Sequence, residues 1–247
     1  MKQTKFLGIL CLILAFISIM VGASSFSWHK LLSGETNTWL LFLESRLPRT
    51  ISIILAGSSM SIAGLLMQTV TQNHFAAPST IGTVNAAKFG MLLSLFFFPT
   101  ANLAQKMLFA FLSSIFFTII FIRFIRKLSF KEKWLLPLVG IIYSGVISAA
   151  AEILAYRFDL VQSMTSWTQG SFAMIQTHQY EWLFLSFVIL IAVWRLSATF
   201  TIMNLGEDAS HNLGISFYQM EGLSLFLIAL TTSVTMITVG SLPFIGV

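Results

Sequence analysis

Charged residues are scarce in this sequence. Only 9% of its 247 residues are charged and 56% are hydrophobic, whereas about 25% of the residues in a typical soluble domain are charged. No globular core could enclose so much apolar surface, so lipid must cover much of it. The net charge of +5 is small and scattered along the chain, which gives no sign of a nucleic-acid-binding patch.

The residues of common catalytic and metal sites are also missing. A single cysteine, Cys11, rules out an internal disulfide and a CxxC motif, and we interpret it as a packing residue. The P-loop, HExxH and GxSxG motifs do not occur, and the four histidines are dispersed. The sequence therefore predicts no catalytic residue, no metal site and no cofactor.

Long apolar runs are present instead. A helix needs about 20 apolar residues to cross the hydrocarbon core, and only helices satisfy the backbone of such runs within lipid. Seven runs qualify, at about 6–24, 50–70, 81–98, 104–124, 135–156, 180–200 and 220–240. The sequence predicts an all-α transmembrane bundle in one domain over 1–247, with the first run retained as a helix and not cleaved as a signal peptide.

The basic residues favour a cytoplasmic N-terminus, because inner loops of membrane proteins are enriched in Lys and Arg. This orientation places eight basic residues inside and five outside. The inner set is Lys2, Lys5, Arg123, Arg126, Lys127, Lys131, Lys133 and Arg195, and the outer set is Lys30, Arg46, Arg49, Lys106 and Arg157. The chain would then end outside on a bare apolar run, which we interpret as a fragment lacking C-terminal helices.

Small residues recur on one face of two runs. They are Gly57, Ser61 and Gly64 in the second run and Gly140, Ser144 and Ser148 in the fifth. Such faces let helices pack closely, or they could line a central passage with room for a bulky solute. Two charges also fall within runs, Glu152 beyond Ser148 and Lys88 in the third run. For Lys88 the alternatives are passage lining or a structural charge pair, and snorkelling to the membrane edge.

A basic segment, Arg46-Leu47-Pro48-Arg49, precedes the second run. Pro48 is suited to the first turn of a helix, which needs no backbone N–H. Arg46 and Arg49 would project from neighbouring positions at the outer surface. They are either interfacial anchors or a docking pair for carboxylates of an external protein.

Two polar segments are expected on the inner side. In 71–85, Asn73 would cap or turn the chain, and His74 has no nearby partner and is expected to be solvated. In 201–219, Glu207 and Asp208 would begin a short helix that ends near Gly214. This helix is either a connector or the element pushed by a motor subunit.

These segments resemble the FecCD-type permeases, the membrane subunits of bacterial ABC importers for ferric siderophores, haem and cobalamin. The matching motifs are Arg46-Leu47-Pro48-Arg49, Ala56-Gly57, Ala63-Gly64, Gln68, Asn73, Ala76, Pro78, Gly82, Trp167, Gly170-Ser171, Leu205-Gly206-Glu207, Leu213-Gly214, Val239-Gly240 and Phe244-Ile245-Gly246. The family has about ten helices, so the resemblance implies that about three are missing here.

The resemblance implies roles for particular residues. Arg46 and Arg49 would pair with acidic residues of the solute-binding protein, and Asn73 and Phe75 would narrow the cytoplasmic gate. The segment that would contact the ATPase comprises Gly206, Glu207, Asp208, His211, Leu213 and Gly214.

The chain departs from the family pattern in two segments. It has Asn73-His74-Phe75 where Asn-Pro-Leu is common, and Gly240-Ser241-Leu242-Pro243-Phe244 where Gly-Pro-Ile-Gly-Phe is common. The second segment, together with Lys88, is similar to the branch that imports iron bound to catecholate-type siderophores.

The implied function is import of iron–siderophore complexes across the bacterial plasma membrane. The implied partners are a second permease subunit, cytoplasmic ATPases, an extracytoplasmic solute-binding protein and membrane lipid, with the ferric siderophore as solute. A haem or cobalamin importer is the alternative within the family. An ion-coupled secondary transporter would need paired carboxylates or broken helices at mid-membrane, and an intramembrane enzyme would need a catalytic cluster.

Overall fold

The computed structural model of the chain describes residues 2–21, 36–127, 135–172, 175 and 180–242. Regular structure within these residues is helical, with one isolated β-bridge between Gln169 and Ser241. The elements are α1 (Lys2–Met20), α3 (Thr36–Leu41), the π-helix η1 (Phe42–Arg46), α4 (Leu47–Thr71), α5 (Thr83–Phe97), α6 (Leu103–Lys127), α7 (Leu135–Arg157), α8 (Val161–Thr168), the 3₁₀-helix η2 (Tyr180–Leu183), α9 (Phe184–Arg195), α10 (Ser197–Met203), α11 (Glu207–Asn212) and α12 (Phe217–Val239).

Four helical stretches of the described chain are long and apolar enough to cross a membrane: Thr38–Thr71, Leu103–Ile125, Leu138–Arg157 and Phe217–Val239. The pair formed by η2–α9 and α10 is apolar enough to be a fifth span, but it bends by 65°. The apolar parts of α1 and α5 are shorter than a full span. Each predicted run therefore coincides with a helix, although the sixth is broken and the third has only 15 residues.

Pro48 lies in the first turn of α4, as the sequence predicts. This turn is not where helical structure begins, because α3 and η1 precede α4 without a break from Thr36. The π-helical turn η1 directly precedes the proline, with the Leu47 N–H bonded to the Phe42 carbonyl. A π-turn shifts the hydrogen-bond register by one residue, so it accommodates the N–H that proline lacks without ending the helix.

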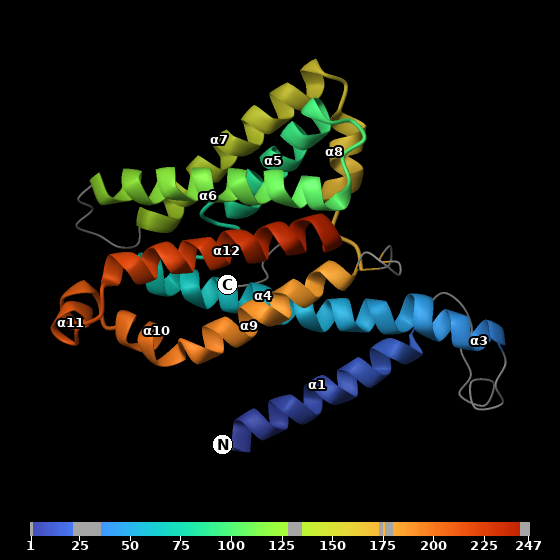
Figure 1. The fold of residues 1–247 in the computed structure, drawn as a ribbon, viewed down its shortest axis with the longest axis horizontal. Helices are drawn as coiled ribbons and strands as arrows, with labels where there is room; N and C mark the ends of the chain where they lie inside the picture. The colour runs from blue at the N-terminus through green and yellow to red at the C-terminus, as the bar shows by residue number, and fades with distance from the viewer. Residues whose placement is uncertain (1, 22–35, 128–134, 173–174, 176–179, 243–247) are drawn as a thin grey trace.

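Helix α12 is the centre of the bundle. It packs against α4, α5, α6 and α9, and Figure 1 shows it between α6 on one side and α4 and α9 on the other. One apolar cluster around Met67, Phe121 and Ile228 fills the half near α11. A second cluster around Met60 and Met236 fills the half near α8.

Close packing of α5 against α6 depends on a glycine. A Cβ on Gly90 would lie 2.3 Å from the carbonyl oxygen of Phe109, so no larger residue fits without separating the helices. The Ser113 hydroxyl donates across the same interface to the Ala86 carbonyl at 2.7 Å. Small residues and interhelical hydrogen bonds hold helices together where lipid removes the hydrophobic driving force.

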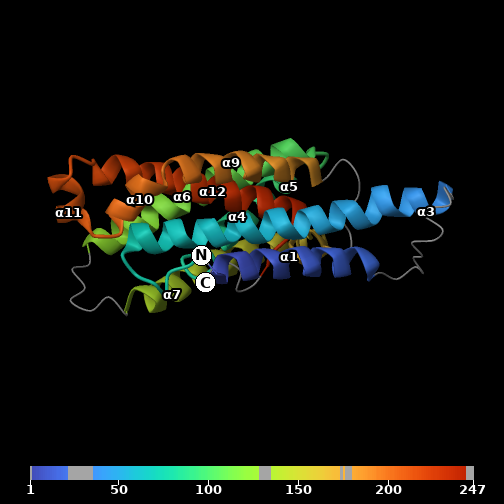
Figure 2. The ribbon, with the colours of Figure 1, turned by 90° about the horizontal axis from the view of Figure 1, so that it is seen from below.

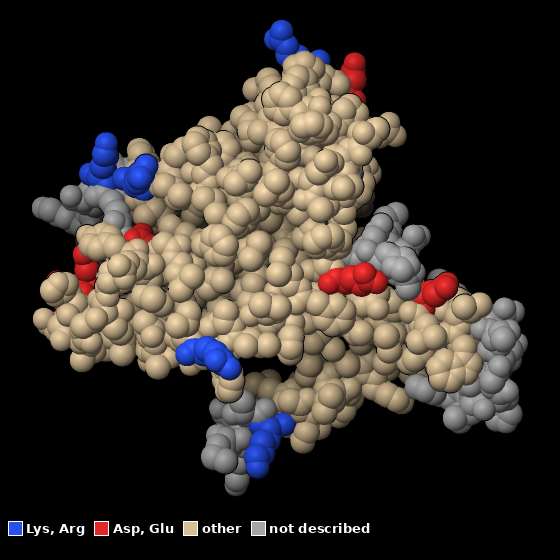
Figure 3. Space-filling view, viewed as in Figure 1, with Lys and Arg blue, Asp and Glu red and all other residues tan. Residues whose placement is uncertain are grey.

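The outer surface of the bundle is apolar. Helix α1 lies at its edge (Figures 1 and 2) and exposes side chains such as Phe6 and Leu12. The space-filling view shows few charged groups over most of the visible face (Figure 3). This surface is suited to contact with lipid tails.

Candidate functional site

The basic segment and the acidic turn lie at opposite ends of the bundle. Arg46 and Arg49 stand at the start of α4, which has 25 residues and a length of about 37 Å. At its far end, the Gln72 amide donates to the Met203 carbonyl at 2.9 Å, and Gln72 and Glu207 line one cavity. We call the end with α10, α11 and Gln72 the α11 end and the opposite one the α8 end (Figure 1).

Arg46 is held inside the protein. Its side chain is 6% exposed, and Nη1 donates to the carbonyls of Ile19 at 2.5 Å and Met20 at 3.0 Å. These carbonyls belong to the last turn of α1, where the helix offers unpaired acceptors and partial negative charge. Arg46 therefore fastens the end of α1 to α4, a contact that sequence spacing did not indicate.

Arg49 lies one turn further along α4 and is half-buried. Its Nε is buried and has no hydrogen-bond partner among the described residues. The two arginines thus occupy different environments, so the predicted pair is not symmetrical. Within the described residues Arg49 makes no hydrogen bond or ion pair, in contrast to Arg46.

The loop between α4 and α5 folds around Asn73. The Asn73 carboxamide oxygen accepts from the Phe75 N–H at 2.9 Å, and the Asn73 carbonyl accepts from the Ala76 N–H at 3.2 Å. Asn73 is buried, whereas Phe75 is 72% exposed and His74 is also exposed. The turn predicted at Asn73 is confirmed, and its geometry presents the Phe75 ring at the α11 end.

Helix α11 matches its prediction in position and boundaries. It begins at Glu207 after Gly206, whose φ of +104° suits glycine, and it ends at Asn212 before Gly214, with a φ of +77°. The Ser210 hydroxyl bonds to the Gly206 carbonyl at 2.7 Å and is buried. The exposed side chains around this short helix are Leu205, Glu207, Asp208, His211 and Leu213.

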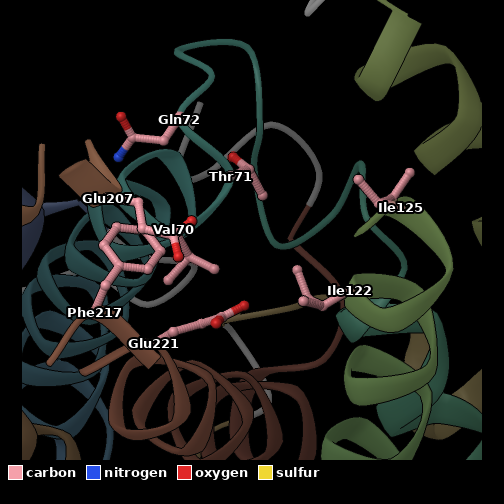
Figure 4. Close-up of a pocket in the computed structure, with 8 residues that line it drawn as sticks. All are labelled: Val70, Thr71, Gln72, Ile122, Ile125, Glu207, Phe217 and Glu221. Atoms are coloured by element: carbon pink, nitrogen blue, oxygen red, sulfur yellow. The ribbon is translucent and has the colours of Figure 1, made fainter. Parts of the chain in front are cut away.

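A cavity of about 240 Å³ lies behind α11, at the meeting point of α4, α6 and α12. Its lining residues are Val70, Thr71, Gln72, Ile122, Ile125, Glu207, Phe217 and Glu221. Figure 4 shows Glu221 and Ile122 facing each other across it. Glu221 is 6% exposed and was missed in the sequence, because a single carboxylate at the start of an apolar run gives no pattern.

The α8 end is closed by a contact between two of the motif segments. The Ser241 N–H donates to the Thr168 carbonyl at 3.0 Å, and the Ser171 N–H donates to the Val239 carbonyl at 2.9 Å. A Cβ on Gly240 would lie 2.7 Å from the Gln169 carbonyl oxygen. We call this backbone contact between 168–171 and 239–241 the clasp.

Beside the clasp, Lys106 places its ammonium 3.6 Å from the centre of the Trp167 ring. A cation over an aromatic face is attracted by the ring quadrupole. This contact ties the first turn of α6 to α8.

The two small-residue faces have different environments. On α4, Gly64 is buried, whereas Ser61 is exposed and an added Cβ on Gly57 would meet no atom within 4 Å. On α7, Gly140 and Ser144 are buried. A Cβ on Gly140 would lie 2.7 Å from the Thr80 carbonyl oxygen, which indicates packing.

The rest of the α7 face is polar and partly open. Asn85 of α5 donates to the Ser144 hydroxyl at 2.8 Å, and the Ser148 hydroxyl donates to the Glu152 carboxylate at 3.2 Å. The Glu152 charge acts on the Lys88 ammonium across the α5–α7 interface. The structure thus brings together the two intramembrane charges that the sequence left in separate runs.

Comparison with known proteins identifies the family. The FecCD transport family matches residues 10–247 of the chain. The chain belongs to this family. This FecCD-family chain is 37% identical over 244 residues to the petrobactin import system permease YclN of Bacillus subtilis, covering 99% of the chain and 77% of YclN. It is 36% identical over 240 residues to the ferric-anguibactin transport system permease FatD of Vibrio anguillarum, covering 95% of the chain and 76% of FatD.

The fold also matches a solved structure. A transporter assigned to the metal-chelate ABC type, in an inward-facing conformation, superposes with a TM-score of 0.76 at 25% identity, over 99% of this chain and 78% of the other. Family and fold together confirm the prediction of a multi-pass, all-α membrane permease. Because the family consists of transport proteins, the prediction that the FecCD-family chain is not an enzyme is also confirmed.

Proposed function

We propose that this chain is the membrane-spanning permease of an ABC importer for ferric siderophores. The similarity to two siderophore permeases, at 37% and 36% identity over almost the whole chain, carries this proposal. The ABC-type structural neighbour supports the view that ATP hydrolysis by a separate subunit drives import. The ion-coupled alternative has less support, because neither close relative nor fold points to it.

The proposed mechanism begins at α11. Its exposed acidic first turn and the flanking Leu205 and Leu213 form a surface that suits a cleft in the ATPase. Movement of α11 would reach α4 through the Gln72–Met203 hydrogen bond and α12 through Phe217, which lines the cavity beside Glu207. The permease thus contributes bistable helix packing and no reaction chemistry of its own.

The α11 end is assigned to the cytoplasm in this proposal. The last two turns of α6 carry Arg123 and Lys127 near this end, and basic residues gather on the cytoplasmic side of membrane proteins. Asn73 and Phe75 then belong to the cytoplasmic gate, with the exposed Phe75 ring as its obstructing group. The N-terminus would also be cytoplasmic.

The α8 end is then the side on which the solute-binding protein docks. Arg49 is partly exposed and makes no hydrogen bond or ion pair among the described residues, so its guanidinium could pair with a carboxylate of the binding protein. Arg46 is already bonded to α1, so its contribution to docking would be indirect. It would hold the end of α1 beside the start of α4, where Arg49 lies. In this proposal the two arginines of the predicted docking pair have different roles.

The passage would form between this chain and a second permease subunit, either a copy of itself or a homologue. The open surface at Gly57 and Ser61 on α4 leaves room for a bulky solute beside it. Gly64 and Gly140, in contrast, are used for packing within the chain.

Uptake of radioiron-loaded siderophore by whole cells tests the proposal. We expect a strain lacking this permease to lose uptake, and a strain whose partner ATPase cannot hydrolyse ATP to lose it equally. Uptake that continues without ATP hydrolysis and stops when the proton gradient collapses would support the ion-coupled alternative and contradict the proposal.

A further inference from the structure

The polar face between α5 and α7 contains a cation, Lys88, that has no direct partner in the described part of the chain. Lys88 is half-buried, and the structure records no hydrogen bond or ion pair for its ammonium among the described residues. Glu152 lies across the same interface, where Phe89 and Leu92 of α5 pack with Ala151 and Ala155 of α7, and its charge acts on the Lys88 ammonium. The Glu152 carboxylate itself accepts a hydrogen bond from Ser148.

This face is open to the outside of the single chain. Glu152 is exposed, and an added Cβ on Gly145, two turns before it on α7, would meet no atom within 4 Å. Charged side chains of membrane helices face a bundle interior or a water-filled cavity, because lipid cannot solvate them. The exposed charge on this face therefore favours water or another subunit as its neighbour over lipid.

A closed structural ion pair does not fit these contacts. Such a pair would bring the ammonium and the carboxylate within hydrogen-bonding distance and satisfy both. Here the carboxylate is bonded to a serine hydroxyl of its own helix, and the ammonium keeps its donors for something else. The neighbouring Asn85 donates through its amide nitrogen to Ser144, and neither residue bonds to Lys88 within the described part of the chain.

From this arrangement we propose that Lys88 is a specificity-determining residue of the passage, which contacts a net-anionic ferric chelate while Glu152 promotes its release. The inference rests on the proposed function and adds a substrate class to it. The ammonium attracts the negative chelate, and the carboxylate nearby keeps the attraction weak enough for the chelate to leave. Transport through a pore requires binding that is favourable on arrival and reversible afterwards.

Two chelates and three variants test this proposal. The complete importer, without its binding protein, is placed in lipid nanodiscs, and quenching of tryptophan fluorescence follows the binding of each chelate. The anionic probe is a ferric tris-catecholate and the electroneutral probe is a ferric tris-hydroxamate. Lys88→Gln should weaken binding of the anionic probe by about tenfold, Lys88→Arg should preserve it, and Glu152→Gln should strengthen it.

Lys106→Gln is the matched control, because it removes a lysine charge from the contact with Trp167, away from the α5–α7 face. It should leave binding of both probes unchanged. Equal affinity of Lys88→Gln and the unsubstituted importer for the anionic probe, or no binding of that probe at all, would overturn the inference.

The same samples separate this inference from the proposed function. Suppose that the unsubstituted importer restores cellular iron uptake and that Lys88→Gln binds both probes with the same affinity as the unsubstituted importer. In that case only the role of Lys88 is refuted. If deletion of the permease leaves uptake of ferric chelates unchanged, the proposed function fails as well. A structural role for Lys88 would instead lower binding of both probes together.

Discussion

The amide of Gln72 donates to the carbonyl of Met203 across a sequence separation of 131 residues. This bond connects the end of α4 to the segment that leads into α11. Because the same Gln72 Nε2 also donates to the Thr69 carbonyl of its own helix at 2.7 Å, this nitrogen is held between α4 and Met203. It is therefore well placed to transmit a displacement of α11 to a helix that runs the length of the bundle.

Replacing Gln72 with leucine should uncouple ATP hydrolysis from transport. The substitution removes the bond to Met203 but keeps the approximate size of the side chain, so assembly should persist. In the reconstituted importer we expect the ratio of solute imported to ATP hydrolysed to fall several-fold, since a net hydrogen bond contributes about 1 kcal/mol. Gln162→Leu, at an exposed position on α8, is the control, and an equal fall there would contradict the prediction.

Arg46 and Arg49 should give different phenotypes. Arg46→Ala leaves two α1 carbonyls without their charged donor, which should cost about 1–3 kcal/mol of stability. Thermal unfolding of the purified permease would show the loss. Arg49→Ala, by contrast, should keep the unfolding temperature and weaken binding of the solute-binding protein, measured by surface plasmon resonance. Identical effects of the two substitutions would refute the assigned roles.

Gly240→Ala should open the clasp. A Cβ there would lie 2.7 Å from the Gln169 carbonyl oxygen and 2.8 Å from the Gly170 Cα, and the backbone φ of +88° disfavours any other residue. We expect a lower unfolding temperature and faster proteolysis at the α8 end. Gly222→Ala, on the same helix with no atom within 4 Å of the new Cβ, should be neutral or slightly stabilising.

A bulky residue at Gly57 should block import without unfolding the protein. The position accepts a Cβ freely, so Gly57→Ala should retain uptake. Gly57→Trp should abolish uptake while the amount of protein in the membrane is unchanged, because the side chain would project into the proposed passage. Normal uptake by the tryptophan variant, measured with radioiron-loaded siderophore, would show that this surface faces lipid.

Hydropathy alone placed a helix at each predicted run, because the length of an apolar run is a local property. The boundaries of α11 could likewise be predicted from Gly206 and Gly214, since each glycine marks a backbone conformation that other residues avoid. Both features, the positions of the helices and the boundaries of α11, can be predicted without knowing the distant parts of the chain.

Long-range contacts could not be predicted in this way. Arg46 looked like a surface residue because its partners, Ile19 and Met20, belong to another helix. The helical structure that precedes Pro48 was not indicated either, because a π-helical turn has no clear sequence signature. Glu152 and Lys88 become related only when α5 packs against α7. For Arg46 and for Lys88 the deciding atoms lie more than 20 residues away in the sequence.

The clasp limits how α12 can move. One tip of this helix is tied by backbone hydrogen bonds to the segment after α8, and its other tip borders the cavity behind α11. Because the clasp joins α12 to the segment after α8 by backbone hydrogen bonds, a displacement of α12 at the α11 end has two possible results. The helix either pivots about the clasp or moves the segment after α8 with it. In the second case, opening of the importer at the α11 end would also change the structure at the α8 end.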